Sequence, residues 1–384
     1  MLKKFSLRNY KNFRDNICIN FDNVGGYQFS TDCITDGMIS KMLIYGRNAT
    51  GKTNLGKGLM DICTVLPGDL IFRNTENILN ADSLEDSAVF SYLFQFDNSE
   101  LIYKYARLSN HELQKEELII NGTTIFKCNF SDRNFEFGNL DYIGAETANK
   151  EVYLQSLYDE DRADEPNETK IPFLRWLVSN VAFKSDSILI RLSNYVRRMT
   201  MITAGNTQFL RPRRMMDNFY ESLEENDRLK DLESFFNAMG IECRLALEKL
   251  PDGQRELYFA HEKLVPFYQS ASSGTLALFD LYRRLISKVW DASFIYLDEF
   301  DAFYHYEMAV KVIQFLKRRY PRCQIVMTSH NTNLMTNRLM RPDCLFILSR
   351  TGSLTALCDA TPRELREGHN LEKMYISGEF EKYE

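Results

Sequence analysis

Residues 46–53 have the types and the spacing of a loop that binds phosphate. The stretch Gly46–Thr53 reads G-R-N-A-T-G-K-T and matches the pattern G-x-x-x-x-G-K-[ST]. Glycines let backbone N–H groups turn toward an anion, and a helix that follows directs its positive end at the same point. Lys52 would reach the outer phosphates of a nucleotide, and the Thr53 hydroxyl would bind Mg2+. The candidate nucleotide-binding residues are Gly46, Asn48, Gly51, Lys52 and Thr53.

The flanking sequence supports this interpretation. Met42–Tyr45 is an apolar, strand-like run, and residues 54–65 have the pattern of a helix. A glycine-rich turn can match the motif by chance, but such a turn has no reason to lie between a buried strand and a helix. We therefore predict that the chain binds a nucleotide at this loop.

Two carboxylates follow a second apolar strand. The run Ser293–Leu297 has the character of a buried parallel strand and ends at Asp298 and Glu299. Sheets of α/β proteins place their sites where such strands end. Asp298 is the candidate to hold Mg2+ through water, and Glu299 is the candidate general base for an attacking water. The alternative is a strand end that carries acids into solvent, but two adjacent carboxylates are costly to bury without a cation.

A third strand, Gln324–Thr328, ends at Ser329 and His330. We expect His330 to contact the terminal phosphate and to sense whether it is present, because it follows the strand in the same way as the other candidates. The alternative is a histidine that only stabilises the strand end. The candidate catalytic residues are therefore Glu299 and His330, and the candidate metal ligands are Thr53 and Asp298.

The composition indicates a globular chain. Of its 384 residues, 44% are hydrophobic and 26% are charged, which suffices for one large core or two ordinary ones. The net charge of -6 argues against non-specific coating of nucleic acid. No apolar run reaches the length of a membrane span, and the first residues lack the apolar stretch of a signal peptide. The eight cysteines show no metal-ligand spacing. We expect a cytoplasmic protein with reduced thiols and no membrane contact.

The other elements follow from periodicity and turn residues. Strands are predicted at Leu2–Leu7 and Asn16–Phe21, and a helical region is predicted over residues 171–240. A capping box at Thr361–Glu364 predicts a short helix, and Cys344–Leu348 is expected to be the last strand. An antiparallel meander is predicted at Ala88–Phe96, Leu101–Leu108, Glu117–Ile120 and Thr123–Cys128, and a hairpin at Glu242–Leu250 and Gln254–Ala260.

Six arginines occur between residues 190 and 214, a stretch without an acidic residue. One interpretation is that they pair with acidic loops elsewhere in the chain. The other is a face that docks DNA or a partner protein, because clustered arginines bind phosphate and carboxylate groups. The residues are Arg191, Arg197, Arg198, Arg211, Arg213 and Arg214.

The order of these motifs resembles that of the ABC-type ATPase heads of RecF, SMC-like proteins and OLD-type ATPases. Ser272–Thr275 resembles the S-S-G-T version of their signature. Asp298–His305 is similar to their D-E-h-D-x-x-h-H element, and Thr328–Leu334 is similar to their T-T-H-N-x-x-L. Asn9–Phe13 resembles their N-F-[RK]-[SN]-F opening. The stretch Arg366–Tyr375 looks like the tail of the stand-alone RloA-type and PARIS AriA-type anti-phage ATPases.

The resemblance implies an α/β ABC-ATPase head, in which a parallel core sheet carries the phosphate loop beside an antiparallel β meander and an inserted helical lobe. The implied cofactors are ATP and Mg2+. The resemblance also implies that Ser272 and Gly274 cap the γ-phosphate of a second subunit, so that two ATP molecules lie between two heads in a homodimer or higher oligomer. The motifs do not place the glutamine that connects Mg2+ to the helical lobe; Gln95 is one candidate. We expect lobe I at residues 1–140, the helical lobe at 141–254 and lobe II at 255–384.

The same resemblance implies a sensor or scaffold subunit of a prokaryotic anti-phage system, which a phage protein triggers and which controls a separate effector. A TOPRIM or HNH nuclease is the expected effector, since no acidic metal cluster follows His330. Long heptad repeats, as in SMC-like proteins, are not expected because only about 220 residues separate Thr53 from Gly274. Two alternatives remain: a RecF-like repair ATPase that binds DNA through the arginines, and a switch that hydrolyses ATP very slowly.

Overall fold

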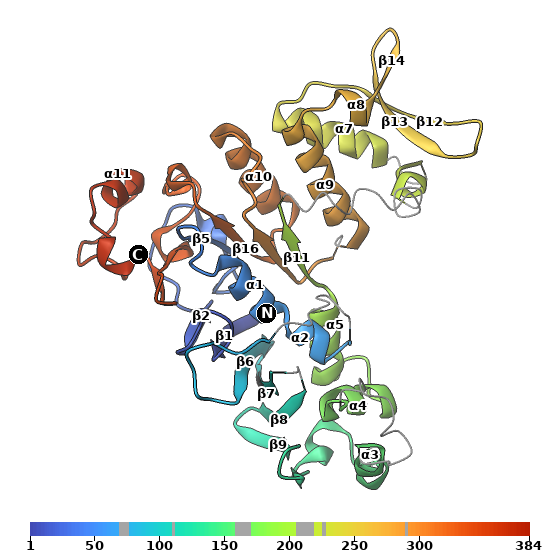
Figure 1. Ribbon diagram of the computed structural model, residues 1–384, viewed down its shortest axis with the longest axis vertical. Coiled ribbons are helices and arrows are strands. Elements are labelled where there is room, and N and C mark those ends of the chain that lie inside the picture. The colour runs from blue at the N-terminus through green and yellow to red at the C-terminus, as the bar shows by residue number, and fades with distance from the viewer. Residues whose placement is uncertain (69–76, 110–111, 158–169, 205–218, 225–227, 289–290) are drawn as a thin grey trace.

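The structure is a computed structural model that describes residues 1–68, 77–109, 112–157, 170–204, 219–224, 228–288 and 291–384. Its two main layers are sheets, one mostly parallel and one antiparallel, and helix α1 (Lys52–Met60) contacts both (Figure 1). Among the described residues, no helix combines the length and the apolar character needed to cross a bilayer. The predicted α/β class, with a parallel core sheet that carries the phosphate loop beside an antiparallel meander, is confirmed.

The mostly parallel sheet carries the phosphate loop. In spatial order its strands are β11 (Met199–Thr203), β15 (Phe294–Asp298), β16 (Gln324–Ser329), β5 (Lys41–Tyr45), β17 (Leu345–Leu348) and β18 (Leu354–Ala356). The first five strands are parallel, and β18 pairs antiparallel with β17. All residues of β5, β15 and β16 are buried, as expected for parallel strands covered on both faces.

The second sheet is the predicted meander, extended by the N-terminal strands. Its spatial order is β10 (Asn134–Glu136), β9 (Thr123–Asn129), β8 (Leu113–Ile120), β7 (Ser99–Leu108), β6 (Ser87–Phe96), β1 (Leu2–Arg8) and β2 (Ile17–Asn20), all antiparallel. Burial alternates along β6, so that Phe90, Tyr92 and Phe94 lie on the buried face. This alternation is the period of two that predicted the strands.

Helix α1 lies between the two sheets because its glycines allow close contact on both sides. A Cβ atom on Gly56 would lie 2.4 Å from the ring of Tyr296, on β15, and one on Gly58 would lie 2.6 Å from Leu7, on β1. Two buried tyrosines hold the helix from opposite sheets. The Tyr296 hydroxyl donates to Lys52 O at 2.6 Å, and the Tyr92 hydroxyl donates to Gly58 O at 3.0 Å. The helix that follows the phosphate loop is therefore fixed in position by both layers.

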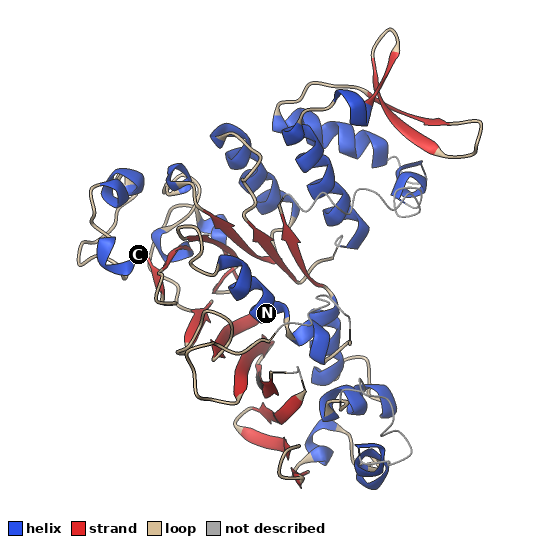
Figure 2. Ribbon diagram, in the orientation of Figure 1, coloured by secondary structure: helices blue, strands red, loops and turns tan. Residues whose placement is uncertain are grey.

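Further helices and a small sheet lie at the two ends of the molecule. Figures 1 and 2 show the antiparallel sheet and α3 to α5 at one end, and α7 to α9 with the small β12–β14 sheet at the other. The helices are α2 (Ile62–Val65), α3 (Lys150–Leu157), α4 (Phe173–Asn180), α5 (Ile188–Arg197), α7 (Arg228–Met239), α8 (Phe267–Ser270), α9 (Ser273–Lys288), α10 (Tyr306–Arg319) and α11 (Leu371–Ile376). The three-stranded sheet contains β12 (Leu245–Lys249), β13 (Arg255–Ala260) and β14 (Leu264–Pro266), and the two-stranded one β3 (Ile34–Thr35) and β4 (Met38–Ile39).

A buried carboxylate attaches the helical segment to the meander. Glu116, on β8, is 1% exposed and accepts hydrogen bonds from Phe173 N at 2.7 Å, Leu174 N at 3.0 Å and the Tyr103 hydroxyl at 2.9 Å. These two N–H groups belong to the first turn of α4, which has no partners for them within the helix. Burial raises the pKa of Glu116 to about 7, and the three donors hold the side chain in one place.

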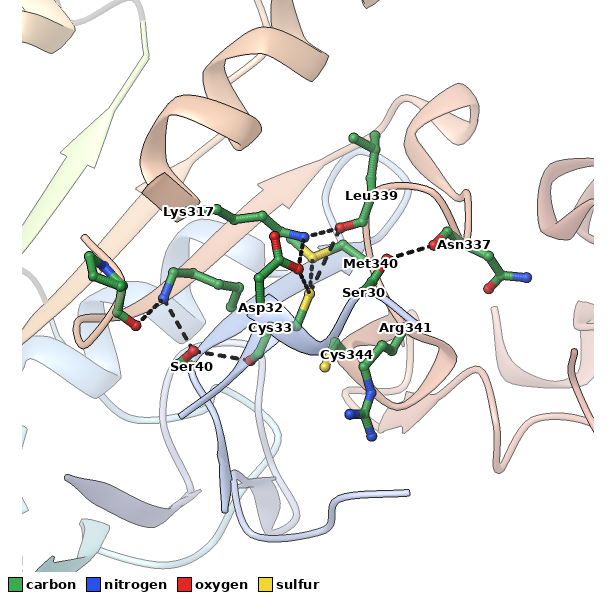
Figure 3. A network of polar contacts seen from close by, with 12 residues as sticks. Ser30, Asp32, Cys33, Ser40, Lys317, Asn337, Leu339, Met340, Arg341 and Cys344 are labelled. Atoms are coloured by element: carbon green, nitrogen blue, oxygen red, sulfur yellow. Dashed lines mark hydrogen bonds and ion pairs between the residues drawn. The ribbon is translucent and has the colours of Figure 1, made fainter. Parts of the chain in front are cut away.

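A network of polar contacts joins the segment before β5 to the loop that precedes β17 (Figure 3). Lys317, on α10, donates to Asp32 Oδ1 at 2.8 Å and to Leu339 O at 2.5 Å. Ser30 Oγ donates to Asn337 O at 2.8 Å. Because these residues are far apart in sequence, the network fixes the start of β5, and with it the direction in which the chain enters the phosphate loop.

Three sequence predictions need correction. The region 171–240, which the sequence predicts to be mainly helical, includes β11, and this strand forms the edge of the parallel sheet. β17 is not the last strand, since β18 follows it. Thr361–Glu364 does not begin a helix: the Thr361 hydroxyl donates to Glu379 and accepts from Arg363 N, which closes a turn instead of capping a helix. The next helix is α11, capped by Asn370. The sequence pattern also predicts helices at Met215–Met239 and Leu276–Val289, of which residues 215–218, 225–227 and 289 lie outside the described residues.

The close contact at Gly56 predicts a stability effect. Gly56→Ala improves helix propensity, but its Cβ would displace the Tyr296 ring and break the bond from Tyr296 to Lys52 O. We expect a net loss of about 2 kcal/mol in the free energy of unfolding, measured by urea denaturation. Gly26→Ala is the control, because a Cβ there meets no atom within 4 Å. Equal stability of the two variants would contradict the close packing of α1 on β15.

Candidate nucleotide-binding site

The site is built where three neighbouring parallel strands end. β16 lies between β15 and β5, with Leu297 opposite Met327 and Ser329 opposite Tyr45. The loops after these strands therefore meet at one edge of the sheet. This brings the phosphate loop, the carboxylates after β15 and the histidine after β16 into one place, as the sequence predicts.

The phosphate loop has the backbone conformation that its glycines allow. Gly51 has φ +101°, and a Cβ there would lie 2.1 Å from Asn12 Nδ2. The Asn12 side chain donates to Thr50 O at 3.1 Å and accepts from Asn54 Nδ2 at 2.8 Å. Asn12 thus supports the loop from the N-terminal segment, and only glycine at position 51 lets it approach. Sequence reasoning assigned Asn12 no role, although it lies in the Asn9–Phe13 motif.

Lys52 is held inside the loop. Its side chain is buried, and its Nζ donates to Gly46 O at 2.7 Å and to Arg47 O at 3.0 Å. The nearest Glu299 carboxylate oxygen lies 3.9 Å from Nζ. Burial lowers the pKa of the Lys52 ammonium below its ordinary value, and the neighbouring carboxylates oppose this shift. The ammonium is therefore placed within the loop curve that would surround a phosphate. Asn48 lies exposed at the tip of the same loop.

Asp298 connects the strand ends. Its carboxylate is 1% exposed and accepts from the Thr53 hydroxyl at 2.7 Å and from the Thr328 hydroxyl at 3.0 Å. Burial raises the pKa of Asp298, while the two hydroxyl donors act in the opposite direction. A hydroxyl and a carboxylate that meet at the end of a phosphate loop are the donor set that Mg2+ prefers. The positions of Thr53 and Asp298 thus fit a magnesium ion.

Glu299 is aimed by an unusual backbone. Its φ is +49°, a conformation that costs energy for a residue with a side chain. Its N–H donates to the Thr328 hydroxyl at 2.8 Å, and this hydroxyl donates in turn to Asp298. Thr328 therefore links Asp298 to Glu299. The strain indicates that the position of Glu299 is imposed by its surroundings and serves a purpose other than stability.

His330 lies exposed at the end of β16, beside a second buried carboxylate. Asp301 accepts from the Ser329 hydroxyl at 2.7 Å, and no described residue donates a hydrogen bond to its other oxygen, which is buried. Burial raises the pKa of Asp301, and the nearby His330 opposes this shift. The segment after β15 and the segment after β16 are thus connected to each other. Sequence reasoning missed this link between Asp301 and Ser329.

The signature residues lie on a different element. Ser272 Oγ accepts from Thr275 N at 3.2 Å and caps α9, and Ser272 is exposed. A Cβ on Gly274 would lie 3.2 Å from Phe303 O, so glycine lets α9 start against the loop that follows Glu299. Within the described ranges, no hydrogen bond or ion pair joins Ser272 or Gly274 to the phosphate loop. One chain therefore brings together every predicted site residue except these two.

Gln95 is not positioned for the site. It lies on β6, where its carbonyl accepts from Met1 N, and Leu2 N donates to Gln324 at the start of β16. The starts of parallel strands lie at the sheet edge opposite the phosphate loop, so the assignment of Gln95 is wrong. β11, in contrast, ends beside Asp298, where Ala204 N donates to Asp298 O at 3.0 Å. The next glutamine in the sequence is Gln208, which lies outside the described residues.

The arginines do not form a free basic face where the structure describes them. Arg191 pairs with Asp97 at 2.6 Å, and Arg198 pairs with Asp291. Both line a pocket of about 430 Å³ at the starts of the parallel strands, far from the carboxyl edge. Arg197 is exposed. The remaining residues of the set, Arg211, Arg213 and Arg214, lie outside the described residues.

A family profile described as "AAA domain, putative AbiEii toxin, Type IV TA system" matches residues 41–336. This match spans the phosphate loop, both carboxylates and His330. The chain belongs to this family. As a member of an AAA-domain family whose matched region includes the phosphate loop, it is a P-loop ATPase by class. No curated protein matches the chain.

Solved structures with a similar arrangement are heads of SMC proteins. An Smc head bound to the C-terminal winged-helix domain of ScpA is 13% identical, covers 90% of this chain and 93% of its own, and has a TM-score of 0.49. The SMC head domain from Thermotoga maritima is 14% identical over 92% and 98% of the two chains, with a TM-score of 0.46. An Smc head domain with an extended coiled coil, bound to the C-terminal domain of ScpA and derived from Pyrococcus furiosus, is 14% identical over 99% of both chains, with a TM-score of 0.46.

The two hydrogen bonds of Thr328 predict an effect on turnover. Thr328→Val keeps the shape but removes the acceptor of the partly buried Glu299 N–H, which costs about 1–2 kcal/mol in the stability of the native loop geometry. We expect ATP turnover to fall about tenfold or more, with nucleotide affinity nearly unchanged, because Lys52 and Thr53 keep their contacts. Steady-state phosphate release and binding of a fluorescent ATP analogue measure the two quantities. Thr355→Val, on β18, is the control, and equal turnover in both variants would exclude the positioning role of Thr328.

Proposed function

We propose that this chain binds and hydrolyses ATP at the edge formed by β5, β15 and β16. The observation that carries this proposal is the connected set of side chains at that edge. Thr53, Asp298 and Thr328 are joined by two hydrogen bonds, Thr328 accepts from Glu299 N, and Lys52 lies within 3.9 Å of the Glu299 carboxylate. A phosphate-binding loop, a metal-binding acid and a candidate base thus share one site.

The proposed roles follow from this geometry. Backbone N–H groups of the loop and Lys52 hold the phosphates, since they combine the helix N-terminus with a buried cation. Thr53 and Asp298 would hold Mg2+, which supplies charge neutralisation of the β- and γ-phosphates. Glu299 orients and deprotonates the attacking water, and His330 contacts the γ-phosphate. Asp301 fixes the segment of His330 through Ser329 and so positions it.

The exposed start of α9 supports a composite site between two copies. Ser272 is exposed and Gly274 partly exposed at the start of α9, and backbone N–H groups and a hydroxyl at a helix start bind phosphate oxygens. We propose that this segment completes the site of a second subunit. The partly exposed Phe303 and Tyr306, which flank the loop after Glu299, add apolar surface to that interface. ATP would then be bound most tightly when two heads meet.

We further propose that the ATPase is the sensor or scaffold subunit of an anti-phage system and controls a separate effector, a TOPRIM or HNH nuclease. The resemblance of Arg366–Tyr375 to RloA-type and AriA-type tails supports this role. The family description, which names a toxin and a toxin–antitoxin system, fits a chain that regulates a harmful activity. Direct DNA binding through the arginines is less favoured, because Arg191 and Arg198 already pair with acids.

The composite site predicts complementation between two inactive variants. Lys52→Ala removes the phosphate contact, and Ser272→Arg blocks the signature, so each variant alone should lack turnover. A 1:1 mixture should regain about a quarter of wild-type turnover, because half of the dimers of a symmetric pair are mixed and each mixed dimer holds one intact site. Phosphate release after co-refolding or subunit exchange measures this.

The control for complementation mixes Lys52→Ala with Glu299→Gln, since both substitutions damage the same half-site. That mixture should recover no turnover, because every site then contains a defective catalytic half. If neither mixture recovers turnover although the variants are folded, a single chain supplies the whole site. Binding of no ATP by the wild-type protein would refute the ATPase proposal.

The effector proposal predicts a stable partner. Glu299→Gln should bind ATP without hydrolysing it, so a tagged form should retain the ATP-bound assembly. We expect affinity purification from native cells with this variant to recover a TOPRIM- or HNH-containing protein, identified by mass spectrometry. Lys52→Ala, which cannot bind ATP, is the matched control. Recovery of no nuclease with either variant would contradict the effector role and leave the ATPase proposal intact.

A further inference from the structure

Residues 361–384, here called the α11 segment, contact the phosphate loop and the segment after His330. The rings of Tyr375 and Tyr45 lie edge to face with their centroids 4.8 Å apart, and Tyr45 is the last residue of β5 before the loop. The Glu384 carboxylate forms an ion pair with Arg47, the second residue of the loop. α11 also lies against η5 (Thr332–Leu334), which follows His330.

The α11 segment is held in place at its other end by buried polar contacts. The Asn337 side chain is 3% exposed and donates to the carbonyls of Arg366, Glu367 and His369 at 2.9–3.2 Å. Leu371 and Phe380 are fully buried. The first part of the segment is therefore anchored, and the ion pair at Glu384 is the contact nearest to the candidate phosphate site. Figure 1 shows α11 at the side of the parallel sheet, next to the end of the chain.

The phosphate loop carries two cationic side chains, Lys52 and Arg47, which differ in burial and in their partners. Lys52 is buried and bound to carbonyls of the loop, one of which belongs to Arg47. Arg47 has an exposed fraction of 55% for its side chain, and its charge is neutralised by Glu384, which is 13% exposed. A nucleotide brings several negative charges to this loop. The Arg47 guanidinium would be attracted to those charges, and the Glu384 carboxylate would be repelled by them.

We propose that the α11 segment is a nucleotide-sensitive latch, in which Glu384 and the phosphates of ATP compete for Arg47. This inference rests on the proposed ATP site. ATP binding would weaken the ion pair and release the Tyr375 side of the segment, while the anchor at Asn337 stays. Because coupling between two sites is reciprocal, the latch lowers the affinity for ATP by the same factor by which ATP opens the latch. Nucleotide occupancy is thereby transmitted from the loop to an outer surface, where Ile376 is 69% exposed.

Glu384→Gln tests the latch. Removing the charge should tighten binding of a non-hydrolysable ATP analogue about three- to fivefold, the range expected for a partly exposed ion pair. Glu381→Gln is the matched control, because Glu381 is an exposed acid in the same short stretch and should leave the affinity unchanged. Isothermal titration calorimetry measures both affinities.

Amide hydrogen exchange in the α11 segment is a second measurement, which a change in net charge alone would not alter. In the wild-type protein, the analogue should increase amide exchange in residues 371–384, and in Glu384→Gln exchange should be high already without it. Equal affinities of Glu384→Gln and Glu381→Gln, or exchange in this segment that nucleotide does not raise, would overturn the latch. A wild-type protein that binds no analogue would overturn the ATP site, and the latch with it.

Discussion

The arrangement of the site depends on one buried carboxylate. Asp298 is removed from water at the end of β15, so its two oxygens need partners from the protein. They are supplied by Thr53, from the start of α1, and Thr328, from the end of β16. One side chain thus sets the distance between the phosphate loop and two neighbouring strands. A carboxylate in this position is stabilised further by a cation, which is what the proposed chemistry provides.

The position of the phosphate loop is determined by the packing of helix α1, which follows it. Helix α1 lies between two sheets and has glycine at both points of closest contact. Tyr296 and Tyr92 hold its carbonyls from opposite sides. Glycine at a helix contact permits closer approach than a residue with a side chain would. The two tyrosines then fix the position of α1 along the two sheets. The loop can therefore carry unfavourable backbone angles because both ends of it are anchored.

Two buried polar side chains attach outlying segments of the chain to the two sheets. Glu116 attaches the helical segment to the meander, and Asn337 attaches the α11 segment to the loop before β17. The start of α9 packs against the loop after Glu299, where Gly274 lies close to Phe303 O. Such contacts couple the outlying segments to the sheets that carry the site, so that a change at the site can reach them. This property suits a molecule whose proposed task is to report nucleotide occupancy to a partner.

The sequence by itself predicted the candidate residues of the site and most of the elements. Gly46–Thr53, Asp298 with Glu299, and His330 are local patterns, because each follows a short run of apolar residues that is typical of a buried strand. The meander was predictable for the same reason, since its period of two is set by neighbours along the chain.

Tertiary structure alone decided which strands are adjacent, that β11 joins the parallel sheet, and that Gln95 lies at the opposite edge. It also decided the roles of Thr328, Asn12 and Glu384, whose partners lie 30, 38 and about 340 residues away. Such contacts leave no periodic trace in a sequence, because they depend on the approach of segments that only the folded sheets bring together.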